Sequence, residues 1–264
     1  MYRELYRFGG VTFALESDAP LERSPVCEAF HVPDGVPDHT ICLRFSDALP
    51  TPPADALRRD DVFRWQAGAQ RHLLQWVSAP GDIPHFTYAV THGAHTDVIF
   101  ASAYRTGASV STALEAVGLF DVFAARGMLV LHSAYIVTSA GEAILFSGPS
   151  GVGKSTQAAL WERCAGARVV NGDRALVDVG KKTANGVFYV LLGQGSENRV
   201  FVPSPQAAFA GVLSQCAYYE WDARSAEQMT ECVARLVSDV PVLRMDCLPN
   251  ATAVEALRGK LGGI

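Results

Sequence analysis

Alternating hydrophobic and polar positions dominate the first hundred residues of the chain. The segments YRFGGVTFAL, HTICLRFSD and HFTYAVTHGAHTDVIFASAY alternate with the period of two that is typical of half-buried strands. We expect the first segment to turn at Gly9 and Gly10, and the last to form a hairpin turning at HGAH. Loops containing proline separate these strands, namely SDAPLERSP, HVPDGVPD and LPTPPADALRRDD. Residues 1–108 are therefore predicted to form a β-rich N-terminal segment.

A helical period first occurs in SVSTALEAVGLFDVFAARG, which predicts one helix capped by Ser111 or Thr112 and followed by Gly127. Further helices are predicted for KSTQAALWERCAG, SAEQMTECVARLVSDV and ATAVEALRGKL. Strands are predicted for MLVLHSAYIVT, EAILFSG, ARVVNGDRALVDV, VFYVLLG, AAFAGVLSQC and VLRMDCL, with GKKTANG as a tight turn. Residues 109–264 are therefore predicted to form a core of the α/β class with mixed α+β character.

One segment of this core has the pattern G-x-x-x-x-G-K-[ST] between a predicted strand and a predicted helix. Its glycines allow backbone N–H groups to surround a phosphate, its lysine reaches the outer phosphates, and its serine offers a hydroxyl to Mg²⁺. The pattern predicts a nucleotide site for ATP and Mg²⁺. The binding residues are Gly148, Pro149, Ser150, Gly151, Val152, Gly153, Lys154, Ser155 and Thr156.

The strands around the loop predict an unusual sheet for a phosphate-binding core. The strand MLVLHSAYIVT leads through a short turn directly into the strand that precedes the loop, which implies antiparallel pairing. The strand carrying Asp173 is likewise expected to enter a hairpin rather than a helix. We therefore expect a mixed, strongly twisted sheet rather than a regular parallel one.

The segment from His132 through the glycine-rich loop to Asp173 resembles the core shared by HPr kinase/phosphorylase and ATP-dependent phosphoenolpyruvate carboxykinase. Both families have a histidine on a strand ahead of the loop, a GxSGxGK[ST] loop, and a strand that ends in paired aspartates. The segment GSENRVFVP is similar to the carboxykinase segment whose arginine contacts the transferring phosphate, which makes Arg199 the match. The resemblance covers roughly residues 128–203.

This resemblance implies a phosphoryl-transfer site with Lys154, Asp173, His132 and Arg199 as catalytic residues and with Ser155 and Asp173 as metal ligands. The chain departs from the family at NGD, because Gly172 stands where the first aspartate would be. One task of the aspartate pair is then unfilled or shared with His132. Arg174, next to Asp173, could contact phosphate or pair with a carboxylate.

The function implied is that of an ATP- and Mg²⁺-dependent kinase that transfers the γ-phosphoryl group to a hydroxyl, with serine of a protein or peptide as the expected acceptor. The alternatives are a small-molecule kinase, for instance on free serine or another hydroxylated metabolite, and a catalytically weak ATP-binding regulatory module. Residues 1–108 are the candidate region for acceptor recognition. A homo-oligomer is compatible with all three functions.

Composition excludes some partners and a location in the membrane. The chain has a net charge of −5 and no run of Lys and Arg of the kind that a nucleic-acid-binding surface needs. No apolar run approaches the ~20 residues of a membrane span, and the N-terminal residues do not resemble a signal peptide. A cytoplasmic protein that binds neither nucleic acid nor membrane is therefore expected.

Three further features have an expected structural role. The six cysteines form no C-x-x-C pair and are expected to be reduced and mostly buried. HGAHTD offers His92, His95 and Asp97 at a spacing suited to a metal, but it lies on a predicted hairpin turn with no further ligands nearby in sequence. We therefore interpret it as a turn. The aromatic cluster Tyr218 to Trp221 is interpreted as packing rather than as a substrate site.

Overall fold

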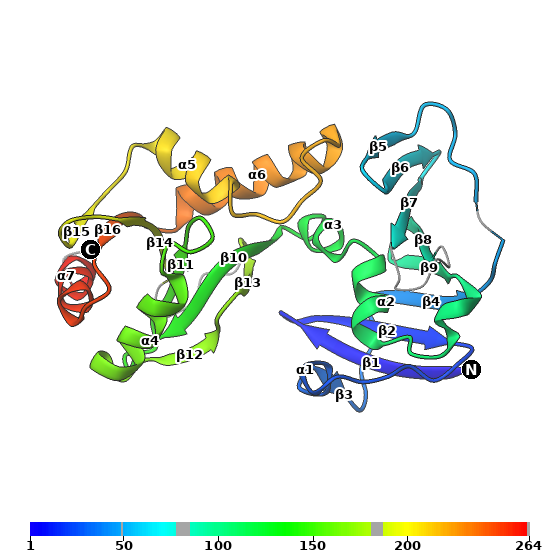
Figure 1. The fold of residues 1–264 in the computed structure, drawn as a ribbon, viewed down its shortest axis with the longest axis horizontal. Coiled ribbons are helices and arrows are strands. Elements are labelled where there is room, and N and C mark those ends of the chain that lie inside the picture. Colours follow the sequence, from blue (N-terminus) through cyan, green and yellow to red (C-terminus); the bar gives the residue numbers. More distant parts are fainter. Residues whose placement is uncertain (49, 78–84, 181–186, 263–264) are drawn as a thin grey trace. The chain divides into compact units, whose positions relative to one another are not determined.

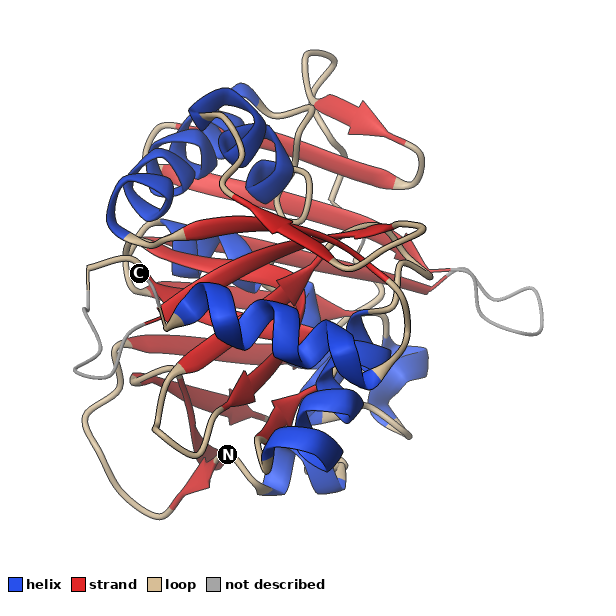
Figure 2. Cartoon of the chain, turned by 90° about the vertical axis from the view of Figure 1, so that its left-hand side faces the viewer, coloured by secondary structure: helices blue, strands red, loops and turns tan. Residues whose placement is uncertain are grey.

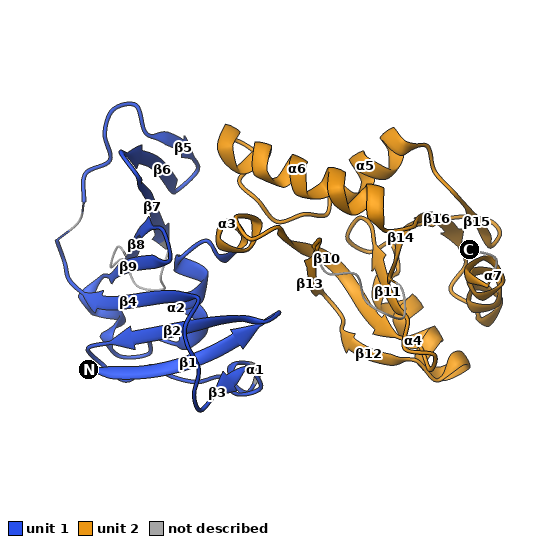
Figure 3. Cartoon of the chain, turned by 180° about the vertical axis from the view of Figure 1, so that it is seen from behind, with its two compact units in different colours: residues 1–119 blue, residues 120–264 orange. Residues whose placement is uncertain are grey.

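The computed structural model describes residues 1–48, 50–77, 85–180 and 187–262. The chain forms two compact units, Met1–Leu119 and Phe120–Ile264 (Figure 3). Both contain a mixed β-sheet with helices, so the chain is a mixed α/β protein. In the part of the chain that the structure describes, no helix is long and apolar enough to cross a membrane.

The N-terminal unit is built on a nine-stranded sheet with the order β3-β1-β2-β4-β9-β8-β7-β6-β5 (Figure 1). Strands β2, β4 and β9 run parallel to one another, and every other neighbouring pair is antiparallel. The bounds are β1 Tyr2–Phe8, β2 Val11–Ser17, β3 His31–Val32, β4 His39–Phe45, β5 Leu57–Arg59, β6 Val62–Ala67, β7 Gln70–Val77, β8 His85–His92 and β9 His95–Phe100. Short helical segments are α1 Pro25–Glu28, η1 Ser102–Arg105 and α2 Val110–Ala116.

The two hairpins predicted for this unit are confirmed. Strands β1 and β2 turn at Gly9 and Gly10, both of which have positive φ, and β8 and β9 turn within HGAH. The prediction of a loop throughout LPTPPADALRRDD is wrong at its end, where Leu57–Arg59 pairs with β6. The three prolines precede this strand and do not prevent it.

The single helix predicted after residue 108 is two short helices, α2 and α3 Leu119–Ala124. Gly118, at φ 61°, separates them, because a left-handed residue ends a helical turn. The predicted caps are also wrong, since the Ser109 hydroxyl accepts the Thr112 N–H. Backbone bonds from Glu22 to Ala108 and from Val110 to Glu22 hold the start of α2 in the N-terminal unit. The division of the chain thus falls later than the predicted one between residues 108 and 109.

The C-terminal unit contains a sheet with the order β12-β10-β11-β14-β16-β15, and β13 pairs with a further part of β10. Strands β11, β14 and β16 are parallel, whereas β10 and β15 are antiparallel to their neighbours. The prediction of a mixed sheet is therefore confirmed. The bounds are β10 Met128–Val137, β11 Ala143–Ser147, β12 Arg168–Asn171, β13 Arg174–Asp178, β14 Val187–Gln194, β15 Arg199–Phe201 and β16 Val242–Cys247.

Helices cover both faces of this sheet (Figure 2). Successive residues of β14 alternate between two cores: Val190 packs with α4 Lys154–Ala165 and α7 Ala251–Leu261, and Leu191 packs with α5 Pro205–Leu213 and α6 Ala223–Asp239. This burial on both sides explains why β14 is almost continuously apolar.

Three predictions for this unit need correction. ARVVNGDRALVDV is not one strand but two, β12 and β13, which both pair with β10 and are separated by the turn at Asn171 to Asp173. AAFAGVLSQC lies mostly in helix α5, because Pro205 stands at the first helical position and Ser204 caps it. The prediction that the strand after Asp173 forms a hairpin with the next strand is wrong. Among the described strands, β13 pairs with β10, and β14 pairs with β11 and β16. Residues 181–186 of the predicted GKKTANG turn lie outside the described residues.

Candidate functional site

The candidate site lies at the C-terminal ends of the parallel strands β11, β14 and β16. Ser147, the last residue of β11, is in register with Leu191, which in turn is in register with Arg244. In open sheets, ligands bind beyond this end of parallel strands, where the loops that follow them converge. The loop of residues 148–153, which we call the glycine-rich loop, leaves the sheet here and leads into α4.

The glycines of this loop are required by its backbone. Gly148 has φ 150°, and a Cβ there would lie 3.0 Å from the Leu192 carbonyl oxygen. Gly151 and Gly153 have open space around them, but their φ values of 76° and 110° exclude most other residues. The loop conformation therefore depends on glycine at these three positions.

The start of α4 lacks the side-chain cap that the other long helices of this unit have. Its N-cap is Gly153, which makes no side-chain hydrogen bond, whereas Ser204, Asp222 and Asn250 cap α5, α6 and α7. The first N–H groups of a helix need acceptors and carry partial positive charge. The first N–H groups of α4 can therefore bind an anion. At the starts of α5, α6 and α7 a side-chain oxygen of the capping residue already occupies this position.

Lys154 lies directly at this helix start and is only 8% exposed. Its Nζ donates hydrogen bonds to the carbonyl oxygens of Gly148 at 3.0 Å and Pro149 at 3.2 Å. Burial lowers the pKa of Lys154, and the negative charge of Asp173 partly opposes that shift. The ammonium group therefore folds back onto the loop. A bound anion can replace the two carbonyl oxygens as its hydrogen-bond acceptor.

His132 and Asp173 form a pair next to the loop. His132 Nε2 lies 3.3 Å from Asp173 Oδ1, and Arg174 Nε lies 3.5 Å from Asp173 Oδ2. The turn that presents Asp173 is fixed by Asn171, whose Oδ1 accepts the N–H groups of Asp173 and Arg174 at 2.9 Å each. The Ser133 N–H donates to the Asp173 carbonyl oxygen at 2.9 Å and so joins this turn to β10.

Two adjoining pockets connect the pair with the loop. A pocket of about 260 Å³ is lined by His132, Asp173 and Arg174 together with residues 214–217. A second pocket of about 440 Å³ is bounded by Gly148, Pro149, Leu191, Phe201, Gly211 and Arg244. Ser214 and Gln215 line both pockets, and the Gln215 carbonyl oxygen accepts the His132 N–H at 2.8 Å. The segment after α5 thus forms the shared wall.

The arginine positioned at the second pocket is Arg244, which the sequence patterns did not indicate. Arg244 Nε donates to Asp246 Oδ1 at 2.9 Å, and Phe201 lies opposite Arg244 across the strand pair. Arg199, the predicted residue, lies on edge strand β15 with its guanidinium 5.2 Å from the Phe201 ring centroid. Arg199 lines neither pocket, so it does not lie with His132 and Asp173, which both line the first pocket.

The remaining predicted loop residues are exposed except one. Ser150, Ser155 and Thr156 face solvent, whereas Val152 packs against the core between β11 and α4. The Ser155 hydroxyl, on the first turn of α4, and the Asp173 carboxylate are oxygen ligands of the kind that Mg²⁺ takes. The uncapped helix start and the Lys154 ammonium fit a phosphate group.

Two other predictions concern packing. The Tyr219 ring lies 4.6 Å from Phe120 and 5.7 Å from Trp221, measured between centroids, so this part of the aromatic cluster packs within the unit. All six cysteines are free, but only Cys27, Cys232 and Cys247 are buried.

Comparison with known proteins gives no family for this chain. No protein-family model matches it, and a search of curated proteins finds no match.

Proposed function

We propose that this protein is an ATP- and Mg²⁺-dependent kinase with a P-loop core like that of HPr kinase and phosphoenolpyruvate carboxykinase. It transfers the γ-phosphoryl group to a hydroxyl, with serine of a protein or peptide as the acceptor. Two observations carry this proposal. Lys154, on an uncapped helix start, bonds to Gly148 and Pro149, which line a pocket that shares a wall with the pocket of the His132–Asp173 pair. The charge of Asp173 also acts on the Lys154 ammonium.

ATP supplies the phosphoryl group, and Mg²⁺ neutralises part of the phosphate charge. Lys154 and the first N–H groups of α4 hold the β- and γ-phosphates, and Ser155 and Asp173 are the ligands offered to the metal. His132 accepts the hydroxyl proton as the acceptor oxygen bonds to the γ-phosphorus and the bond to the ADP oxygen breaks. Asp173 stabilises the imidazolium that results, since the two side chains already lie at ion-pair distance.

A macromolecular acceptor fits the exposure of the pair better than a small metabolite does. The side chains of His132 and Asp173 are 41% and 70% exposed. A metabolite kinase should enclose its substrate in a pocket that excludes water, whereas a serine on a protein chain can approach an open one. The alternative of a weak ATP-binding module is favoured by Gly172, which leaves a single carboxylate for two tasks.

The test is transfer of label from γ-³²P-ATP to peptide and metabolite pools, together with equilibrium binding of ATP. Lys154→Ala and Asp173→Ala should each lower transfer by about 100-fold or more, since each removes a charge that stabilises the transition state. Lys260→Ala and Asp239→Asn are matched controls, because both residues are exposed at helix ends of the same unit.

The outcomes separate the candidates. Label on a peptide that depends on Lys154 and Asp173 supports the protein kinase, and label only on a metabolite supports the small-molecule kinase. ATP binding that requires Lys154, with no transfer above the Lys154→Ala background, supports the regulatory module. If all variants label and bind like the wild type, the proposed function is wrong.

A further inference from the structure

A second group of chemically reactive side chains lies on the polar face of the N-terminal sheet. Glu16 on β2 is in register with Cys42 on β4, and Cys42 is in register with Asp97 on β9. Residues in register on neighbouring strands point to the same face of a sheet. His95 precedes Asp97 by two positions and so shares that face, whereas Ile41 and Leu43 point into the core on the other side.

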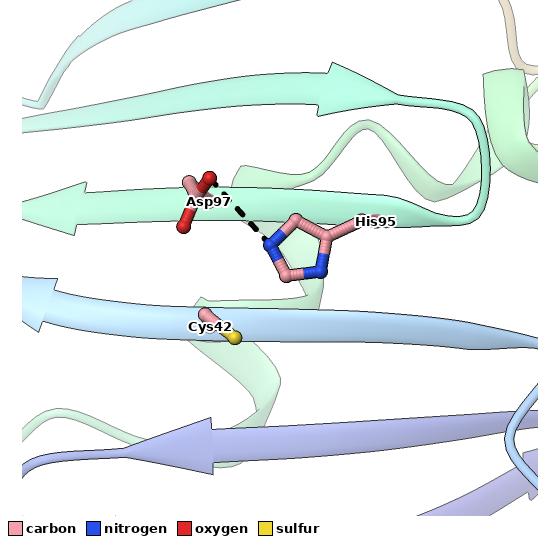
Figure 4. Close-up of side chains that lie close together, drawn as sticks. All are labelled: Cys42, His95 and Asp97. Atoms are coloured by element: carbon pink, nitrogen blue, oxygen red, sulfur yellow. Dashed lines mark ion pairs between the residues drawn. The ribbon is translucent and has the colours of Figure 1, made fainter.

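Cys42, His95 and Asp97 offer one ligand atom each, and these atoms all lie within 4.8 Å of one another (Figure 4). His95 Nε2 is 3.5 Å from Asp97 Oδ2, and Cys42 Sγ is 3.5 Å from Glu16 Oε2. A tetrahedral ion with bonds of about 2.0–2.3 Å places its ligand atoms roughly 3.3–3.8 Å apart. Small rotations of these side chains therefore suffice to enclose an ion.

We propose that the N-terminal unit binds a zinc-class divalent ion through Cys42 Sγ, an imidazole nitrogen of His95 and a carboxylate oxygen of Asp97. Glu16 or water completes the tetrahedron. Thiolate and imidazole together select Zn²⁺ and similar borderline metals over Mg²⁺ and Ca²⁺, which take oxygen ligands. The ion links strands β4 and β9. With Glu16 as the fourth ligand, it also links β2.

The present partners of these ligands are weak competitors. Arg44 lies 2.9 Å from Asp97, and Arg3 lies 3.2 Å from Glu16, with both arginine side chains more than half exposed. Exposed ion pairs contribute little to stability, so a metal can displace them. The Cys42 thiol donates to Glu16. Coordination needs the thiolate, so the thiol proton is released to solvent as the metal–sulfur bond forms.

The proposed site gives HGAHTD a role beyond that of a turn. The turn is present, but the ligand absent from the local sequence is Cys42 on the neighbouring parallel strand. His92 lies opposite His95 across the hairpin and does not belong to the group of three.

The test is titration of the full-length protein with Co²⁺ in the absence of nucleotide, followed by displacement with Zn²⁺. Cobalt bound to a thiolate gives a near-ultraviolet charge-transfer band, which identifies sulfur as a ligand. Cys42→Ser should abolish the band, and His95→Ala and Asp97→Asn should each weaken binding by more than about tenfold. The matched controls are Cys164→Ser and Asp55→Asn, which change exposed residues outside the group.

Circular dichroism of each variant verifies that it folds. The proposal is overturned if the wild type shows no thiolate band, or if Cys42→Ser keeps it. It is also overturned if the controls weaken binding as much as the site variants do. Because the titration needs no ATP and should be unchanged in Asp173→Ala, its result is independent of the proposed kinase activity.

Discussion

Gly193→Ala tests whether Arg244 acts at the second pocket. Gly193 lies on β14 beside β16, and a Cβ at this position would overlap the Arg244 guanidinium and the Asp246 carboxylate. Its φ is not in the left-handed region, so alanine fits the backbone. Both overlapped groups are ends of flexible side chains, and the substitution should therefore turn Arg244 away from the pocket without unfolding the sheet.

The effect on stability should be small. The Arg244–Asp246 pair is more than a third exposed on both sides, and such pairs contribute about 0–1 kcal/mol. Replacing glycine by alanine restricts the unfolded chain and returns about 0.4–1 kcal/mol. These contributions nearly cancel, so the free energy of unfolding should change by less than about 1 kcal/mol.

The effect on activity should be large, if the proposed kinase reaction holds. A hydrogen bond from a charged donor contributes about 1.5–3 kcal/mol, which corresponds to a roughly 10- to 150-fold loss of transfer. Radiolabel transfer and urea unfolding are measured on Gly193→Ala, Arg244→Gln and the double variant. The two single variants should lose activity to a similar extent, and the double variant should lose little more.

Gly259→Ala is the matched control, because it makes the same change at an exposed position of α7 with open space around it. It should stabilise the unit by about 0.5–1 kcal/mol and leave transfer unchanged. If Gly193→Ala keeps full activity, or if Arg244→Gln does, the assignment of Arg244 to the site is refuted.

Three other variants test single features of the unit. Gly172→Asp should raise the rate of phosphoryl transfer by supplying a second carboxylate, and an unchanged rate contradicts this. Its free energy of unfolding should stay within about 0.5 kcal/mol of the wild type, because a Cβ at this position meets nothing within 4 Å. Ser225→Ala should cost about 1–3 kcal/mol in urea unfolding, because the buried Ser225 hydroxyl donates to the buried Asp121 carboxylate at 2.8 Å; a cost near zero contradicts it. The free energy of unfolding of the wild type, relative to that of Lys154→Met, should rise as the pH rises toward 10.5. The pKa of Lys154 is lowered in the folded state, so the folded state releases this proton at a lower pH than the unfolded state does. A difference that is independent of pH contradicts this prediction.

The parts of the fold that the sequence predicted are those that depend on local patterns. The period of two placed the hairpins of the N-terminal sheet, and the turn between β10 and β11 predicted their antiparallel pairing. Errors arose where a local pattern was compatible with two structures. The small apolar residues of AAFAGVLSQC suit a strand or a helix, and in the helix found there Gly211 packs closely against Leu191.

The position of the glycine-rich loop could be predicted from the sequence alone. Glycine tolerates the φ values that the turn demands, and Lys154 follows at a fixed spacing. The resemblance implied that His132 and Asp173 belong to one site, and the register of β10 with β13 brings the two side chains together. Arg244 and Cys42 had no signal in the sequence. Their neighbours come from distant segments, and strand register in three dimensions, rather than spacing along the chain, decides which side chains share a face and a pocket.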